Sequence, residues 1–350
     1  MAEVYKIFNP ADDIIGGDVQ IVSTPLWSER INPLSQSYLS GVGFFTSSTQ
    51  MDIAGAYYVD VYHRDPETRT DAEQQFALAY GNIRGSGSTG DPNTTGQNVN
   101  DTPSRAIYGQ YRNLLLPPTD NQFTFGGVNP NDIFVINIQR ARYRQKIDPG
   151  NWELRIGRGS TAANWTTNYV SLIDGSGAGE NPNVNATGRV FAVYSGSGAT
   201  TASGIPQMGL FYPDSGIIVL NASQVSASAQ MNIWNSGSTS NTTKNHVELF
   251  KRISGSSYFA ARSEEKINST HYFVRITNKQ FNFTNNPTFV ASGSTAGAFL
   301  YPQMYGNPSV YITSVGLYDN VNRLLAVAKL SQPLLKSFQR EVLIKVKLDY

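Results

Sequence analysis

The sequence predicts a mainly β, multi-domain protein built from antiparallel sheets or a sandwich, with one or two short helices. Short runs rich in β-branched and aromatic residues recur along the chain, and Gly, Ser, Asn and Pro separate them. Charged residues make up 15% of the 350 residues, whereas about 25% is usual for a soluble protein. The 19 tyrosines and 17 phenylalanines are enough to build a core and aromatic contact surfaces.

Length and local amino-acid composition divide the chain into three predicted domains. A chain of 350 residues usually holds two or three domains. Residues 1–155 are expected to form a β-rich N-terminal domain with short helices, and residues 156–245 form a β insert rich in Gly, Ser and Asn. Dense apolar strands return in 246–350, where we expect a C-terminal β domain that ends in a hairpin and an assembly arm.

The N-terminal domain contains both predicted helices. Residues 56–62 (AYYVDVY) predict a strand, because β-branched and aromatic residues dominate them. Thr70 with Glu73 three residues later is a capping-box pattern, so a short helix is expected near 70–80. A second helix is expected over 103–116, where apolar residues follow helical spacing until two prolines end it.

Strands are predicted for most of the remaining apolar runs, at 132–138, 189–194, 216–220, 272–276 and 281–283. The clearest pattern lies in the last forty residues.

Two apolar runs, 311–319 and 324–330, are joined by a polar turn and predict a β-hairpin. Pro333 is expected to separate residues 330–350 from this hairpin as an assembly arm. Within that arm a strand is predicted, because apolar residues alternate with Lys345 and Lys347. The apolar residues on one face, which we treat as interface candidates, are Val342, Ile344, Val346 and Leu348.

The sequence predicts no catalytic residue, cofactor or metal site. Cysteine is absent, which excludes disulfides, thiolate ligands and cysteine nucleophiles. His63, His246 and His271 do not occur in a metal-binding spacing. The His63-Arg64-Asp65 triplet is similar to a kinase catalytic loop but lacks its partner motifs. The glycine-rich stretches lack a phosphate-loop lysine, and no G-x-S-x-G elbow occurs.

Adjacent acidic residues do not predict paired-acid catalysis either. The adjacent carboxylates are Asp12-Asp13 and Glu264-Glu265, but neighbours in a strand point to opposite faces and cannot share a proton. Acidic residues distant in the sequence could still meet in space, and a glycan hydrolase therefore stays open as the least supported alternative.

One charge pattern stands out, the basic residues that follow the predicted strand at 132–138. Arg140, Arg142, Arg144 and Lys146 continue the phase of the apolar residues in that strand and would form a basic stripe. An anionic partner such as DNA or an acidic neighbouring subunit is one interpretation, and a solvated strand end is the other. The formal net charge is only +1, which favours a protein contact or a solvated face over nucleic acid.

The cellular context follows from the same observations. The N-terminus does not have the pattern of a signal peptide, and no apolar window reaches the length of a membrane span. The absence of cysteine fits a protein made in a reducing cytosol. We therefore expect no membrane partner.

Several segments of the chain form recognisable phrases. They are 6–19 (KIFNPADDIIGGDV), 44–50 (FFTSSTQ), 106–116 (AIYGQYRNLLL), 140–154 (RARYRQKIDPGNWEL), 272–275 (YFVR), 282–289 (NFTNNPTF), 315–319 (VGLYD), 324–331 (LLAVAKLS) and 344–349 (IKVKLD). These segments resemble structural proteins of contractile-tailed bacteriophages, closest to the T-even-like myoviruses of cyanobacteria. The resemblance spans nearly the whole chain and is weakest over 85–102 and 175–245.

This resemblance implies a non-enzymatic structural subunit of a virion that is made in the host cytoplasm. A tail or baseplate component, of the wedge or connector type, is the leading expectation, and a neck or capsid-associated protein is the alternative within the same class. Its partners would be other virion proteins, in multiple copies of a symmetric assembly. The phrases carry no catalytic role, so no catalytic residue is transferred.

A receptor- or carbohydrate-binding virion module is the alternative from a different class. Exposed tryptophans could stack on sugar faces, and Trp152, Trp165 and Trp234 are the candidates. Burial in the core is the more common role for such large aromatic side chains, so the sequence favours a core position for them.

Overall fold

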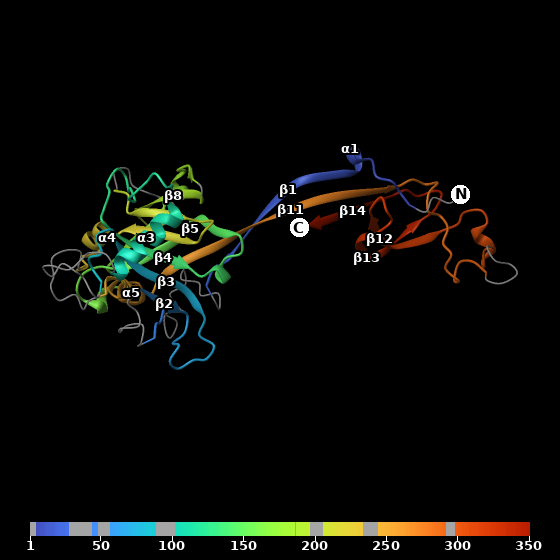
Figure 1. Cartoon of the computed structure of the whole chain (residues 1–350). Coiled ribbons are helices and arrows are strands. Elements are labelled where there is room, and N and C mark those ends of the chain that lie inside the picture. Colours follow the sequence, from blue (N-terminus) through green and yellow to red (C-terminus); the bar gives the residue numbers. More distant parts are fainter. Residues whose placement is uncertain are drawn as a thin grey trace. The chain divides into compact units, whose positions relative to one another are not determined.

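The computed structural model describes residues 5–27, 44–47, 57–88, 102–185, 187–196, 206–233, 244–291 and 298–350. It confirms the predicted fold class, because 45% of the chain is strand and a large antiparallel sheet dominates (Figure 1). Contacts divide the chain into two compact units. The central unit consists of residues Val22–Glu265, and the terminal unit combines Met1–Ile21 with Lys266–Tyr350. The chain passes between the units within β1 (Ile14–Pro25) and within β11 (Phe259–Ile276).

The central unit is built on a sheet whose neighbouring strands pair antiparallel. A short strand, β7 (Asn183–Asn185), pairs with β8 beside it. In spatial order the sheet runs from the first part of β11 through β5 (Lys146–Gly157), β6 (Tyr169–Asp174), β8 (Gly188–Ser195), β9 (Gly209–Tyr212), β10 (Ile217–Asn221), β4 (Asp132–Ile138) and β3 (Gln74–Asn82) to β2 (Tyr58–Tyr62).

Both faces of this sheet are covered, so its central strands are apolar throughout. In β4, Phe134 and Ile136 point into one core cluster, whereas Ile133 and Val135 point into another. The alternation follows from the two-residue period of a strand. The sheet is strongly curved, because the Phe76 ring on β3 lies 5.3 Å from the Phe259 ring at the other end of the strand order.

Helices cover the two faces. The helix predicted at 103–116 is confirmed as α3 (Pro103–Leu115), which packs Ile107, Tyr108 and Tyr111 onto one face. Two helices were not predicted, α4 (Ala222–Ala229) and α5 (Asn245–Ser256), and both contribute to the core on the other face. Short 3-10 turns occur at η4 (Arg140–Arg142), η5 (Ala162–Asn164), η6 (Gly175–Ala178) and η7 (Pro302–Met304).

The helix predicted near 70–80 is wrong, because this segment forms β3. The strand pairs with β2 on one side and with β4 on the other. Phe76 and Leu78 enter one core cluster and Ala79 the other, so both faces of the segment are buried. The pairing with β2 and β4 overrides the local capping pattern. This is common for short apolar runs, because they fit the helical period and the strand period equally well.

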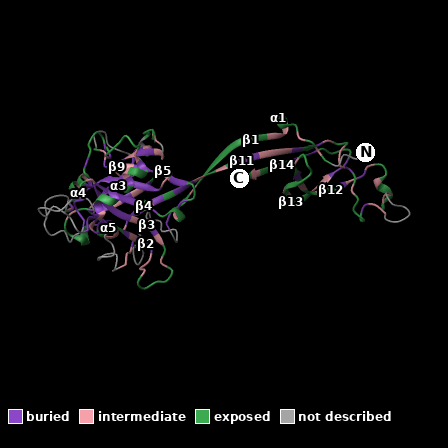
Figure 2. Cartoon of the chain, viewed as in Figure 1, coloured by how far each residue is buried: buried purple, intermediate pink, exposed green. Residues whose placement is uncertain are grey.

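The terminal unit is a smaller β assembly. The second part of β11 pairs with β14 (Val342–Asp349), and β12 (Val310–Tyr318) pairs with β13 (Leu324–Lys336). A four-residue helix, α1 (Pro10–Asp13), precedes β1. Figure 2 shows β1 exposed along most of its length, whereas β3, β4 and β5 of the central unit are largely buried.

The predicted hairpin is confirmed, but the predicted break at Pro333 is wrong. β13 continues through Pro333 to Lys336, and a bulge opposite residues 312–314 of β12 accommodates the change of register. Residues 342–349 pair with β11 along their whole length, so they are part of a sheet rather than a free arm. The run at 281–283 is not a strand, and Phe281 has φ 51°.

The division into units also differs from the predicted domains. The boundary expected near 155 falls inside β5, which pairs with β6 and β11, and the one near 245 falls at the start of α5. Composition changes at these points, but sheet pairing continues across them, because strands that are distant in sequence complete the same sheet.

Candidate functional site: an apolar groove and an open strand edge

A groove of about 1150 Å³ runs along β12 in the terminal unit. Its walls are mostly apolar and come from β12, from the N-terminal residues 5–8 and from the loop that follows β11. The Tyr5 and Tyr318 rings meet edge to face in it, with their centroids 5.4 Å apart. Asp319, Asn320 and Asn322 bring polar groups to one end. The groove can therefore accept an extended apolar or aromatic group with a polar end.

The strand beside this groove has an open edge. β12 pairs with β13 along one edge, and no described residue donates or accepts a backbone hydrogen bond along the other. Its nine residues, VYITSVGLY, include no charged side chain. Proteins usually protect exposed edge strands with charges, because an open edge accepts a strand from another chain. An uncharged open edge is the feature expected of a strand that another chain covers.

Exposed apolar side chains concentrate in the same unit. Among the described residues, eighteen of the twenty-four exposed large apolar side chains belong to the terminal unit, which holds less than a third of the chain. Tyr311 is 66% exposed on β12, and Leu325 is 68% and Val327 62% exposed on β13. Such clusters mark interaction surfaces, whereas single exposed apolar residues do not.

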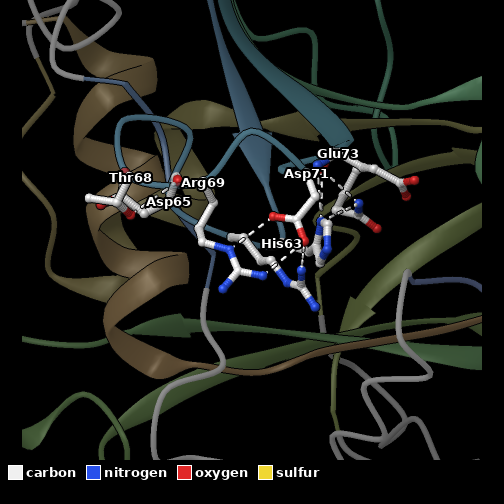
Figure 3. Close-up of polar contacts among 8 residues, drawn as sticks. His63, Asp65, Thr68, Arg69, Asp71 and Glu73 are labelled. Carbon is white, nitrogen blue, oxygen red and sulfur yellow. Dashed lines mark hydrogen bonds and ion pairs between the residues drawn. The ribbon is translucent and has the colours of Figure 1, made fainter.

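A polar cluster lies in the central unit, at the connection between β2 and β3 (Figure 3). The Arg69 guanidinium donates to both carboxylate oxygens of Asp71, at 2.9 and 2.8 Å, and Arg64 also contacts this carboxylate. The hydrogen bond from Arg69 lowers the pKa of Asp71 to about 2, and the Arg64 charge acts in the same direction. Asp65 accepts from the Glu67 N–H and stabilises the turn.

His63 in this cluster has a structural role. Its ring is buried, and the backbone N–H of Glu73 donates to Nδ1 at 3.1 Å. The same Nδ1 atom lies 3.2 Å from the carbonyl oxygen of Glu73, so the ring ties the ends of the two strands together. A catalytic dyad needs a nucleophile within hydrogen-bond reach of a base. Among the described residues, the side-chain and backbone groups that contact the His63 ring belong to Glu73 and Gln75, and none of them is a nucleophile.

The structure places the predicted basic residues in contacts within the chain, not in a stripe. The η4 turn interrupts the strand phase at Arg140. Arg142 pairs with Glu73 at 2.8 Å, and Arg144 pairs with Glu265 at 3.0 Å. The side chain of Lys146 is buried against Glu264 at 2.6 Å, and Arg140 stacks on the Tyr143 ring at 4.6 Å. The continuous basic face that the strand phase predicted is therefore not formed.

The C-terminal interface candidates are mostly core residues. Val342, Ile344 and Val346 are buried in the core of the terminal unit, and Leu348 packs against it half-buried. They face the chain's own hairpin residues, so they are not a surface in this conformation. The surface that the sequence did not single out is the exposed face of β12 and β13. Its only sequence signal is the run of apolar residues on both faces of 324–330.

The tryptophan candidates for glycan stacking are buried where the structure describes them. Trp152 packs against Phe211 at 5.3 Å, and Trp165 lies beneath the Arg252 guanidinium at 4.6 Å. Trp234 lies outside the described residues.

In the part of the chain that the structure describes, no group of three or more His, Asp or Glu side chains could hold a metal ion. None of the described helices combines the length and apolarity needed to cross a bilayer. Comparison of the chain with family models, with curated proteins and with solved structures found no match.

Proposed function

We propose that this chain is a non-enzymatic structural subunit of a contractile-tailed phage virion, most consistent with a tail or baseplate component that acts by protein–protein assembly. The observation that carries the proposal is the surface of the terminal unit, with its uncharged open edge on β12 and its exposed apolar residues. The resemblance of the sequence to such virion proteins supplies the class of assembly.

The central and terminal units would then have different tasks. Among the described residues, the central unit packs its apolar core into two large clusters. The terminal unit has one small cluster, with six buried apolar residues among those described, and leaves many more exposed. An assembly subunit needs such a surface, because burial of apolar area between copies drives association.

Localisation in the particle tests this proposal. Phage particles that carry the chain with a small epitope tag would be labelled with gold-conjugated antibody and imaged. Label at the tail tip or baseplate is the expected result. Label at the neck or head would retain the structural class and reject the position, and absence of the chain from purified particles would overturn the proposal.

Glycan binding is a second candidate, favoured by one specific feature. The groove places the exposed rings of Tyr5, Tyr311 and Tyr318 near the polar groups of Asp319 and Asn320. Aromatic faces that flank hydrogen-bonding groups suit a sugar ring. A glycan array probed with the purified chain separates the two functions, since binding that Tyr311→Ala abolishes would favour a receptor-binding role.

A further inference from the structure

We propose that the terminal unit is cross-linked by an intramolecular isopeptide bond between Nζ of Lys336 and Cγ of Asn282. This inference is independent of the proposed function, because it rests on two buried side chains and their chemistry.

Lys336 is a fully buried amine in direct contact with a side-chain amide. It lies at the end of β13 with 0% of its surface exposed, and Asn282 is 6% exposed. The Lys336 Nζ atom is 2.7 Å from Oδ1 of Asn282. Its other contacts are the backbone oxygens of Asn278 at 3.1 Å and Ser337 at 3.0 Å. None of these contacts is a carboxylate, so the amine is buried without a bonded counter-ion.

The turn after β11 holds the amide in place. The Nδ2 group of Asn282 donates to the Asn278 carbonyl at 2.7 Å, and the preceding residue, Phe281, has the left-handed φ of 51°. A bulky residue adopts this conformation only where the surrounding structure imposes it. Both reacting groups are therefore fixed before any reaction, which removes the entropic cost of bringing them together.

The reaction needs a neutral amine, and burial shifts Lys336 towards this form. Desolvation lowers the pKa of Lys336, and the charge of Glu341 opposes this only in part. A buried lysine with a lowered pKa is the usual form of an activated amine nucleophile. Glu341 is the carboxylate whose charge acts on this amine, and it lies five residues further along the chain.

The step balances without a further reagent. The lone pair of Nζ attacks Cγ of Asn282, the Nζ–Cγ bond forms, and the Cγ–Nδ2 bond breaks. The leaving nitrogen takes one proton from Nζ and departs as ammonia, so a primary amine and a primary amide become one secondary amide. No oxidant or reductant is involved.

A covalent link at this position suits the unit that contains it. The terminal unit has a small core, and small cores commonly need a covalent or metal cross-link. The chain has no cysteine, so a disulfide is not available. The proposed bond would join residues 54 positions apart, the end of β13 and the turn after β11.

Mass spectrometry of the purified full-length chain tests the proposal. The intact mass should be about 17 Da below the sequence mass, the mass of one ammonia lost when a buried lysine acylates. Trypsin cuts after Lys279, Arg323, Lys329 and Arg340. The digest should therefore contain residues 280–323 joined to residues 330–340, with no cleavage after Lys336.

Two variants control for other losses of ammonia. Lys336→Arg keeps a cation but removes the nucleophilic amine, so the mass deficit should disappear, whereas the exposed neighbour Lys279→Arg should keep it. The full sequence mass together with a free 330–336 peptide would overturn the proposal. A mass deficit without the joined peptide would also overturn it, because it would indicate a succinimide elsewhere. The wild-type digest decides the question even if a variant fails to fold.

Discussion

The Nζ atom of Lys146 lies 2.6 Å from Oε1 of Glu264, and less than a tenth of either side chain is exposed. The two residues are direct partners in the β5–β11 register. Glu265, the next residue, points the other way and pairs with the largely exposed Arg144. The adjacent acids therefore point to opposite faces, as the strand period requires, and each neutralises one of the predicted basic residues.

Removal of one member of the buried pair should destabilise the central unit. Lys146→Met leaves the Glu264 carboxylate buried without a partner, which should lower the free energy of unfolding by about 3–5 kcal/mol. Chemical denaturation measures this change. The double variant Lys146→Met/Glu264→Leu should recover most of the loss. Arg144→Met removes the exposed pair and should cost less than about 1 kcal/mol, so equal losses for the two single variants would contradict the assignment.

Two helical glycines should respond to alanine with opposite signs. In an exposed helix the change stabilises by about 0.5–1 kcal/mol, because alanine loses less backbone entropy. Gly109 in α3 has open space around an added Cβ and should show this gain. A Cβ on Gly255 in α5 would fall on the Trp165 ring. That ring is fixed by the stacked Arg252 and by its own hydrogen bond to Gly159, so Gly255→Ala should destabilise by about 1–3 kcal/mol. Thermal unfolding of both variants checks the signs.

Asp71 should titrate far below an ordinary aspartate. The Arg69 hydrogen bond lowers the pKa to about 2, against about 3.9 in an unfolded chain. Because the folded pKa is the lower one, the ion pair stabilises the fold above pH ~4, and this contribution is lost as the pH falls towards 2. In Arg69→Gln the Asp71 midpoint should rise towards 3.9, whereas Asp319, held by Arg323, should not change. Carboxyl NMR titration measures both, and an unchanged Asp71 midpoint would refute the bidentate contact.

A charge on the outer face of β13 should weaken assembly. Val327 on β13 and Val184 on β7 are both exposed strand valines, at 62% and 77%. If the terminal unit is the interface, Val327→Lys places an unpaired charge in it and should reduce self-association and incorporation into particles at least about tenfold, since a buried unpaired charge costs several kcal/mol. Val184→Lys lies in the central unit and should have no effect. Light scattering of the purified variants and their abundance in particles measure this, and equal behaviour of the two would place the interface elsewhere.

The sequence predicted helices and strands most reliably where the apolar residues follow only one of the two periods, the helical or the strand period. In residues 344–348 apolar side chains alternate with lysines, and this segment lies in β14 with the predicted apolar face buried or half-buried. Helix α3 combines helical spacing with prolines at its first position and after its end. The segment around β3 lacks such a signal, because Phe76, Ala77 and Leu78 fit either period, and only its two neighbouring strands decide the outcome.

The sequence by itself determined the mainly β class, the C-terminal hairpin and the absence of thiol chemistry, because these depend on residue types and local spacing. Only the tertiary structure decided which charged and nucleophilic side chains are paired or buried. Arg142, Arg144 and Lys146 meet acids that are 69, 121 and 118 positions away, and Lys336 meets Asn282 across 54 positions. Charge and nucleophilicity depend on such neighbours and on burial, and strand pairing between distant segments sets both.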